Sequence, residues 1–204
     1  MHDNSHPLIV VYGNTQKEDF PLILVVGREP NNNVPFDDSV GNYDFEKAPR
    51  CNFWNTAYKV VADTNGINVR ELKDSCKKNK SSILAFTDLS PRPLLIRVKN
   101  KEKQRSQISK KEFDNHILKI FSKNEIINRV GIIILSGVKN KPEFIDALNI
   151  FKKQCGKYQK SFLEIPFLYS GNYREIKSII TESQKNTIMK IYRRWKDDTH
   201  SCKL

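Results

Sequence analysis

Runs of four or five consecutive apolar residues recur along this chain, and each is closed by a small or polar residue. Residues 22–26 precede Gly27, residues 83–86 precede a polar turn, and residues 132–135 precede Ser136. Short continuous apolar runs that are rich in β-branched residues are typical of strands buried on both faces. The sequence therefore predicts strands in the interior of a sheet, covered by other elements above and below.

Amphipathic segments separate these strands. In residues 113–121 apolar side chains recur at helical spacing, and Ser109 with Glu112 predicts a capping box in front of them. The same spacing predicts helices at 53–62, 69–77, 142–154 and from Tyr173 onward. Strands that alternate with helices predict an α/β fold, in which a mostly parallel central sheet carries helices on both faces in three layers.

The remaining segments carry weaker signals. Residues 8–12 and 162–167 are expected to be strands, and Gly156 is expected to end the helix before it. A long irregular loop is expected after Gly27, and an exposed charged loop at 99–107. No internal repeat or linker divides the chain, so we expect one domain over residues 1–204 with a short N-terminal extension, residues 1–6.

Simple features of the sequence limit the classes of protein to consider. No apolar run approaches the roughly 18 residues that cross a bilayer, and the N-terminus lacks the order of a signal peptide. These features predict a soluble cytoplasmic protein, or a nuclear one in a eukaryote. The scattered cysteines predict buried or unreactive thiols rather than a metal knuckle; they are Cys51, Cys76, Cys155 and Cys202.

The chain is basic. It has 35 Lys and Arg against 23 Asp and Glu, a formal net charge of +12. A basic domain attracts polyanions, of which nucleic acid is the commonest. Because the lysines are spread along the chain, we expect a folded basic face that binds nucleic acid; the resemblance described below favours DNA over RNA as that partner. A basic surface without such a partner is the alternative.

Ligand sites in parallel sheets lie at the carboxyl ends of the strands. That rule selects residues 27–36, where Gly27 is expected to let the chain turn off its strand. Arg28 offers a forked donor for a phosphate or carboxylate, and Glu29 is a carboxylate that can orient water as a base. The alternative for this loop is a solvated turn without chemistry.

Two further loops follow predicted strands. Asp88 emerges from a buried strand, where it can read the edge of a small planar ligand; the alternative is a turn-forming Asp. Ser170 and Asn172 precede a helix, where hydroxyl, amide and helix N-terminus suit a phosphate; the alternative is an ordinary helix cap.

The order of these motifs resembles the uracil-DNA glycosylase superfamily. The loop 27–30, Gly-Arg-Glu-Pro, is similar to the Gly-x-x-Pro loop of that family, and Phe36 follows it after Pro35. The resemblance implies that Glu29 activates or positions water and that Phe36 stacks on a flipped base. It implies that Gly27 and Asp88 contact that base, with Asp88 where the family usually has Asn.

The other motifs of this resemblance follow in the same order. Residues 132–137 are similar to a later strand of the family and its small-residue turn, and residues 168–170 correspond to its His-Pro-Ser loop. The resemblance implies that Arg28, Ser170 and Asn172 contact nucleic acid. It implies no metal or organic cofactor.

Two departures from the family bear on the chemistry. Leu168 stands where the family has an electrophilic His, so the usual stabilisation of the departing base is missing. An ionised Asp88 only accepts hydrogen bonds, which suits the amino group of cytosine; a protonated Asp88 serves uracil but needs a raised pKa.

The resemblance thus predicts a DNA-base glycosylase-like protein, which binds DNA and hydrolyses the N-glycosidic bond of a flipped, damaged or deaminated base. One alternative is an inactive glycosylase-fold module that binds nucleic acid or protein. Another is a metal-dependent hydrolase of a small molecule or nucleotide, which would need Glu29 and Asp88 to approach each other around a metal.

Overall fold

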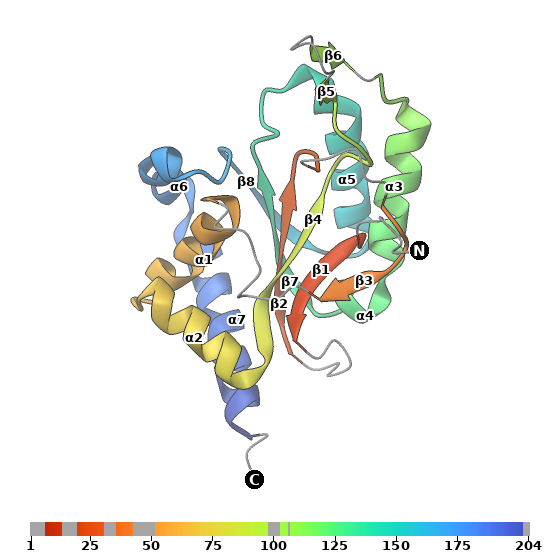
Figure 1. The fold of residues 1–204 in the computed structure, drawn as a ribbon. Helices are drawn as coiled ribbons and strands as arrows, with labels where there is room; N and C mark the ends of the chain where they lie inside the picture. Colours follow the sequence, from red (N-terminus) through yellow and green to blue (C-terminus); the bar gives the residue numbers. More distant parts are fainter. Residues whose placement is uncertain are drawn as a thin grey trace.

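The computed structural model describes residues 7–13, 20–30, 36–42, 52–97, 103–105 and 107–201. Within these residues, six strands form one sheet in the order β3-β1-β4-β2-β7-β8 (Figure 1). The strands are β1 (Ile9–Gly13), β2 (Leu22–Gly27), β3 (Val40–Asn42), β4 (Ser81–Asp88), β7 (Val130–Ser136) and β8 (Ser161–Ile165). β4, β2, β7 and β8 are mutually parallel, whereas β1 runs antiparallel to β4. The expectation of a mostly parallel sheet is confirmed.

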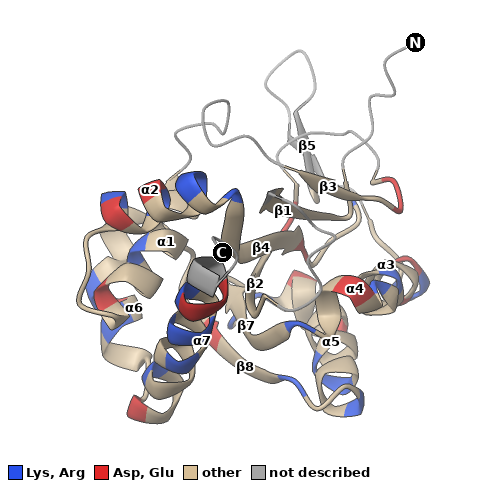
Figure 2. Cartoon of the chain, turned by 90° about the horizontal axis from the view of Figure 1, so that it is seen from below, with Lys and Arg blue, Asp and Glu red and all other residues tan. Residues whose placement is uncertain are grey.

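Helices cover both faces of the sheet (Figure 1). One face carries α1 (Asn52–Thr64), α2 (Val69–Asn79), α6 (Tyr173–Ile179) and α7 (Glu182–Ser201). The other face carries α3 (Lys110–Ser122), α4 (Asn124–Ile127) and α5 (Ile145–Lys157). Seen from below in Figure 2, the two groups of helices lie on opposite sides of the strands.

The apolar run of β2 explains this arrangement. Ile23 and Val25 pack into the cluster under α1 and α7, while Leu24 and Val26 pack into the cluster under α3 and α5. All four side chains are fully buried. A strand that is apolar at every position needs cover on both sides, which is what the sequence predicted.

The start of α3 is predicted correctly. The Ser109 side chain accepts from the Glu112 backbone N–H and the Glu112 side chain accepts from the Ser109 N–H, so the predicted capping box begins α3.

The cysteines that the structure describes agree with the prediction, since Cys76 and Cys155 are buried free thiols. Cys51, Cys202, Pro35 and residues 1–6 lie outside the described residues.

Other boundaries differ from the prediction. Part of the expected irregular loop forms β3, which pairs with β1, and part of the expected charged loop forms β6 (Lys103–Arg105), which pairs with β5 (Leu95–Arg97). These three-residue strands have no periodicity of their own and depend on their partners. Gly156 lies inside α5 rather than ending it.

The C-terminal part of the chain also differs. The last strand of the sheet in chain order, β8, lies at its edge and ends at Ile165, two positions before the predicted end. The single helix predicted after Tyr173 is broken between α6 and α7, where Ile180 is extended and the Thr181 side chain accepts from the Gln184 backbone N–H.

The connections leave the sheet in opposite directions around β2. After β2 the chain passes to α1 and α2 on one face, whereas after β4 and β7, the two neighbours of β2, it passes to α3 and α5 on the other. Such reversals leave space at the carboxyl ends of parallel strands, where ligands bind in folds of this type.

In the described part of the chain no helix is both long enough and apolar enough to cross a membrane.

Candidate functional site

The carboxyl ends of β2 and β4 bring two predicted residues into direct contact. Gly27 and Asp88 are opposite each other in the parallel pairing, and Oδ1 of Asp88 lies where a Cβ on residue 27 would stand. Beyond the strands, Leu89 N–H donates to the Gly27 carbonyl at 2.9 Å and Ser90 N–H donates to the Arg28 carbonyl at 3.0 Å. The two strand-end loops are therefore fastened together immediately beside the carboxyl group.

Gly27 is required for a different reason from the one expected. It is the last residue of β2 and lacks the positive φ that a sharp glycine turn would use. Its missing side chain instead leaves room for the carboxyl group of Asp88.

The surroundings of Asp88 favour its protonated form. The residue is half-buried and its carboxyl group is enclosed by protein atoms. Burial, and secondly the charge of Glu29, raise the pKa of Asp88 to about 7. Both protonation states are therefore populated near neutral pH, which is a property of groups that exchange or share protons with ligands.

Glu29 lies close enough to Asp88 for its charge to act there, and it is itself half-buried. Its Oε2 accepts a hydrogen bond from the Leu94 backbone N–H, so Glu29 ties the loop after β4 to the loop after β2. Among the described residues, no three His, Cys, Asp or Glu side chains converge in a way that could hold a metal ion.

Aromatic rings border Asp88 on the α1 side of the sheet. The Phe53 ring tip lies 3.5 Å from the position of a Cβ on Gly27. Its centroid is 6.3 Å from that of Phe86 and 5.7 Å from that of Phe167. Trp54 stacks on Phe86 with centroids 4.6 Å apart. These rings form a wall beside the Asp88 carboxyl group, and we call Phe53, Phe86 and Phe167 the aromatic wall.

The aromatic wall is not predicted from the sequence, which places Phe53 only at the start of a helix and Phe167 only at the end of a strand. A signal was present, because Phe53 begins the first helix after the loop that contains Glu29, and Phe167 follows the strand that ends at the same edge.

Phe36 lies elsewhere. Its ring packs on His116 of α3, with centroids 5.0 Å apart, in the cluster on the other face of the sheet. Asp88 shares the α1 face with Phe86, two residues before it in β4, because side chains alternate along a strand. His116, on which Phe36 packs, contacts the backbone of Asp88, since its Nε2 donates to the Asp88 carbonyl at 2.9 Å.

His116 is almost fully buried in this second cluster. Burial, and secondly the charge of Lys119, lower its pKa to about 4 against the opposing effect of the hydrogen bond to Asp88. His116 is thus a neutral residue that supports the end of β4, and its ring is turned away from the Asp88 carboxyl group.

The loop after β8 contributes less than the sequence suggested. Leu168 is fully buried, and its backbone N–H donates to the Ser136 hydroxyl at 2.9 Å. The Asn172 side chain donates to the Phe167 carbonyl at 3.0 Å, and Ser170 is exposed in a single 3₁₀ turn. The phosphate roles of Ser170 and Asn172 stay predictions.

Arg28 points across the same edge of the sheet. It is half-buried, and its guanidinium carbon lies 4.6 Å from the centroid of the Phe167 ring. The structure therefore gathers Gly27, Arg28, Glu29 and Asp88 at one place, with the aromatic wall beside them.

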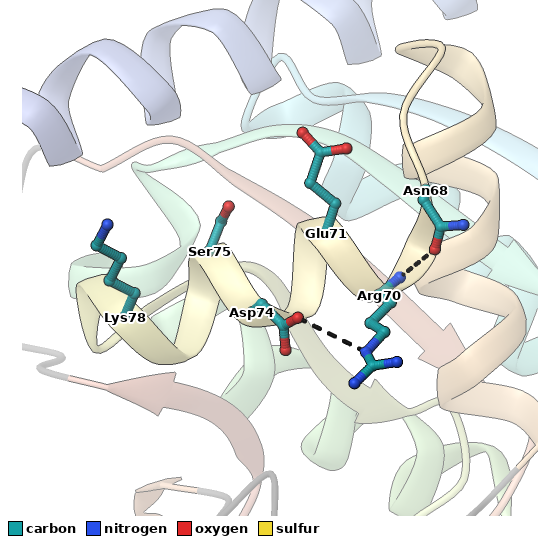
Figure 3. A pocket seen from close by; sticks show the side chains of 6 residues that line it. All are labelled: Asn68, Arg70, Glu71, Asp74, Ser75 and Lys78. Atoms are coloured by element: carbon teal, nitrogen blue, oxygen red, sulfur yellow. Dashed lines mark hydrogen bonds and ion pairs between the residues drawn. The ribbon is translucent and has the colours of Figure 1, made fainter.

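Two surface grooves lie outside the cluster of Gly27, Arg28, Glu29 and Asp88. The groove in Figure 3 is lined by α2 and its N-cap, and three of its residues bind one another: Asn68 accepts from the Arg70 N–H at 2.8 Å, and Arg70 pairs with Asp74 at 3.9 Å. The second groove borders the loop held by Glu29; its lining residues are Leu94, Gln107, Ile108, Ser109, Glu112, Phe113 and Glu143.

Charged side chains are distributed over both helical layers. Figure 2 shows Lys and Arg on helices of both groups, with Asp and Glu interleaved on α2 and α7. The expected basic face for nucleic acid stays a prediction.

Comparison of the sequence with protein-family models found no match, and comparison with curated proteins found no significant match.

Proposed function

We propose that this protein is a DNA-glycosylase-like enzyme, which binds a flipped base at the carboxyl ends of β2 and β4 and hydrolyses its N-glycosidic bond. The observation that carries the proposal is the carboxyl group of Asp88, which lies against Gly27 and has a pKa of about 7. A protonated carboxyl group offers an O–H donor beside a carbonyl acceptor. This pair complements a ring carbonyl beside a ring N–H.

The hydrogen-bonding edge of a base decides whether Asp88 can pair with it. Uracil and hypoxanthine carry a carbonyl beside a ring N–H, whereas cytosine and adenine carry an amino group beside a bare ring nitrogen. Protonated Asp88 can pair with the first pair of bases, whereas ionised Asp88, which only accepts hydrogen bonds, cannot donate to their ring carbonyl. Phe53 supports this reading, because the tip of its ring lies beside Gly27 and Asp88 and its aromatic face could stack on a base.

Two carboxyl groups supply roles for hydrolysis. One oxygen of Glu29 is held by the Leu94 N–H, which leaves the other to orient water. The O–H of Asp88, donated to the base carbonyl, offsets the negative charge that develops on the departing base. The Asp88 proton would thus replace the stabilisation that the family draws from His, because Leu168 occupies that position.

A second candidate function is base binding without cleavage. The observation that favours it is Leu168, which is fully buried and donates its N–H to Ser136, so this loop presents no electrophilic side chain. Weak leaving-group stabilisation would leave a module that recognises a base and holds it.

The experiment that separates these candidates measures both binding and base release. Oligonucleotides containing uracil or hypoxanthine, single-stranded and in duplex, are incubated with the full chain and with Glu29→Gln, Asp88→Asn and Asp88→Ala. Asp88→Asn keeps a donor beside an acceptor and should bind, whereas Asp88→Ala should not. Glu29→Gln should bind without releasing base.

Asp74→Asn is the matched control, since Asp74 is an exposed carboxylate on α2 that lies outside this place. Binding without release by the unmodified protein supports the second candidate. Equal affinity for oligonucleotides with and without these bases contradicts both.

A further inference from the structure

Arg28 has an unusual position for a charged side chain. It leaves the end of β2, and its guanidinium lies over the ring of Phe167, which follows β8. Because β7 stands between β2 and β8 in the sheet, the side chain crosses the carboxyl end of β7. It therefore lies in the space between connections that leave the sheet in opposite directions.

The guanidinium has donors without acceptors. Nε of Arg28 is buried and has no hydrogen-bond partner among the described residues, and Arg28 forms no ion pair there. Two acids at the same edge of the sheet have other contacts, since Glu29 accepts from the Leu94 N–H and Asp88 lies against Gly27. Arginine has five N–H donors, and a buried donor without an acceptor is unfavourable, so an external anion is the natural partner.

The residue whose ring lies under Arg28 packs closely on Gly137. Gly137 has φ of +73°, and a Cβ there would lie 2.9 Å from Cβ of Phe167 and 3.1 Å from its Cα. Gly137 N–H donates to the Ile165 carbonyl at 2.9 Å, and the Asn172 side chain donates to the Phe167 carbonyl. A guanidinium lying on a fixed ring is oriented in advance and keeps its edge donors available for a bidentate anion.

We propose that Arg28 on Phe167 is an oxyanion subsite that binds the phosphate of the nucleotide whose base occupies the position beside Asp88. The inference rests on the proposed function for the base. Gly27 and Arg28 are consecutive residues, so the base position and the guanidinium lie within the span of one nucleotide. The ligand class is therefore a nucleotide, free or within a strand, rather than a free base or a nucleoside.

The test compares ligands that differ only in the phosphate. Dissociation constants of deoxyuridine and deoxyuridine monophosphate are measured by calorimetry for the full chain and for Arg28→Gln and Arg28→Lys. Arg70→Gln is the control, because Arg70 is an exposed arginine on α2. The unmodified protein and Arg70→Gln should favour the monophosphate by about tenfold or more, which is the size of one good charge-assisted contact.

Arg28→Gln should abolish this preference and leave the affinity for deoxyuridine unchanged. Arg28→Lys should retain part of it, since the charge stays and the fork is lost. Inorganic phosphate should compete with the monophosphate and not with deoxyuridine. Equal affinity of the unmodified protein for both ligands overturns the inference, and so does a preference that survives in Arg28→Gln.

The same ligands separate this inference from the proposed function. If base recognition is wrong but the subsite exists, deoxycytidine monophosphate binds as well as deoxyuridine monophosphate, and both depend on Arg28. If no nucleoside or nucleotide binds, the test of the subsite is the effect of inorganic phosphate on thermal unfolding. Phosphate should raise the unfolding temperature of the unmodified protein relative to chloride at equal ionic strength, and this rise should vanish in Arg28→Gln. The subsite is overturned if the rise persists in Arg28→Gln or if the unmodified protein shows no rise.

Discussion

Oδ1 of Asp88 occupies the position that a Cβ on Gly27 would need, at the end of two paired parallel strands. The glycine and the acid thus form one unit, in which the small residue lets the carboxyl group lie against the sheet. The enclosure that follows, together with the charge of Glu29, raises the pKa of Asp88 to about 7.

The first prediction concerns this contact. Gly27→Ala places a methyl group against the Asp88 carboxyl and should lower the free energy of unfolding by about 1–3 kcal/mol. Chemical denaturation measures the loss. In the double variant with Asp88→Ala the collision is absent, so most of the cost of the new methyl group should disappear. Additive effects of the two substitutions would show that Asp88 is not the group displaced.

The second prediction concerns the pH dependence of stability. The pKa of Asp88 is about 7 in the folded chain, against 3.8 for an ordinary Asp side chain. A raised folded-state pKa contributes stability that is present at low pH and is lost as the pH rises toward 7. Asp88→Asn removes this dependence. Relative to the unmodified protein, it should gain on the order of 4 kcal/mol between about pH 4 and pH 8. A constant difference across that range contradicts the raised pKa.

The third prediction concerns the loss of folding stability at acid pH. The pKa of His116 is lowered from 6.5 to about 4. A lowered folded-state pKa contributes stability that is present above pH 6.5 and is lost as the pH falls toward 4. His116→Gln keeps a donor for the Asp88 carbonyl and removes the titration.

Since Asp88 and His116 act in opposite directions over the same pH range, this comparison is made in the Asp88→Asn background. The urea midpoints of Asp88→Asn and of the double variant with His116→Gln should converge as the pH falls from about 7 to 4, or the double variant should become the more stable of the two. Parallel pH profiles would mean that His116 is already charged in the folded chain.

The fourth prediction tests the start of α3. Ser109→Ala removes the hydroxyl that accepts from the Glu112 N–H and should cost about 1 kcal/mol of stability. Ser75→Ala on α2, where no cap is lost, should change stability by less than about 0.5 kcal/mol. Thermal unfolding of both variants checks the difference, and equal effects would contradict the capping role.

The sequence was informative where one strand or helix carries its own signal. The apolar runs predicted β2, β4 and β7, and the capping box predicted the start of α3. The rule that sites lie at carboxyl ends then selected Glu29 and Asp88, which the structure brings close enough to interact.

Contacts between distant segments could not be predicted in the same way. β3 exists because β1 lies beside it, and its own three residues carry no strand pattern. Whether Phe36 or Phe53 lies beside Asp88 depends on which face of the sheet each loop reaches. The sequence indicated only that an aromatic residue follows the loop of Glu29.

We propose that Asp88, in its protonated form, forms the hydrogen bonds that recognise a base. The most direct measurement is the ratio of affinities for two single-stranded oligonucleotides that differ only in one uracil or cytosine, followed with pH. For the unmodified protein, the ratio should shift away from uracil and toward cytosine as the pH rises through about 7, because ionised Asp88 cannot donate to a uracil carbonyl. Asp88→Asn, which does not ionise in this range, should show the same ratio at every pH. A preference that does not change with pH in the unmodified protein, or a pH dependence that survives in Asp88→Asn, contradicts the account.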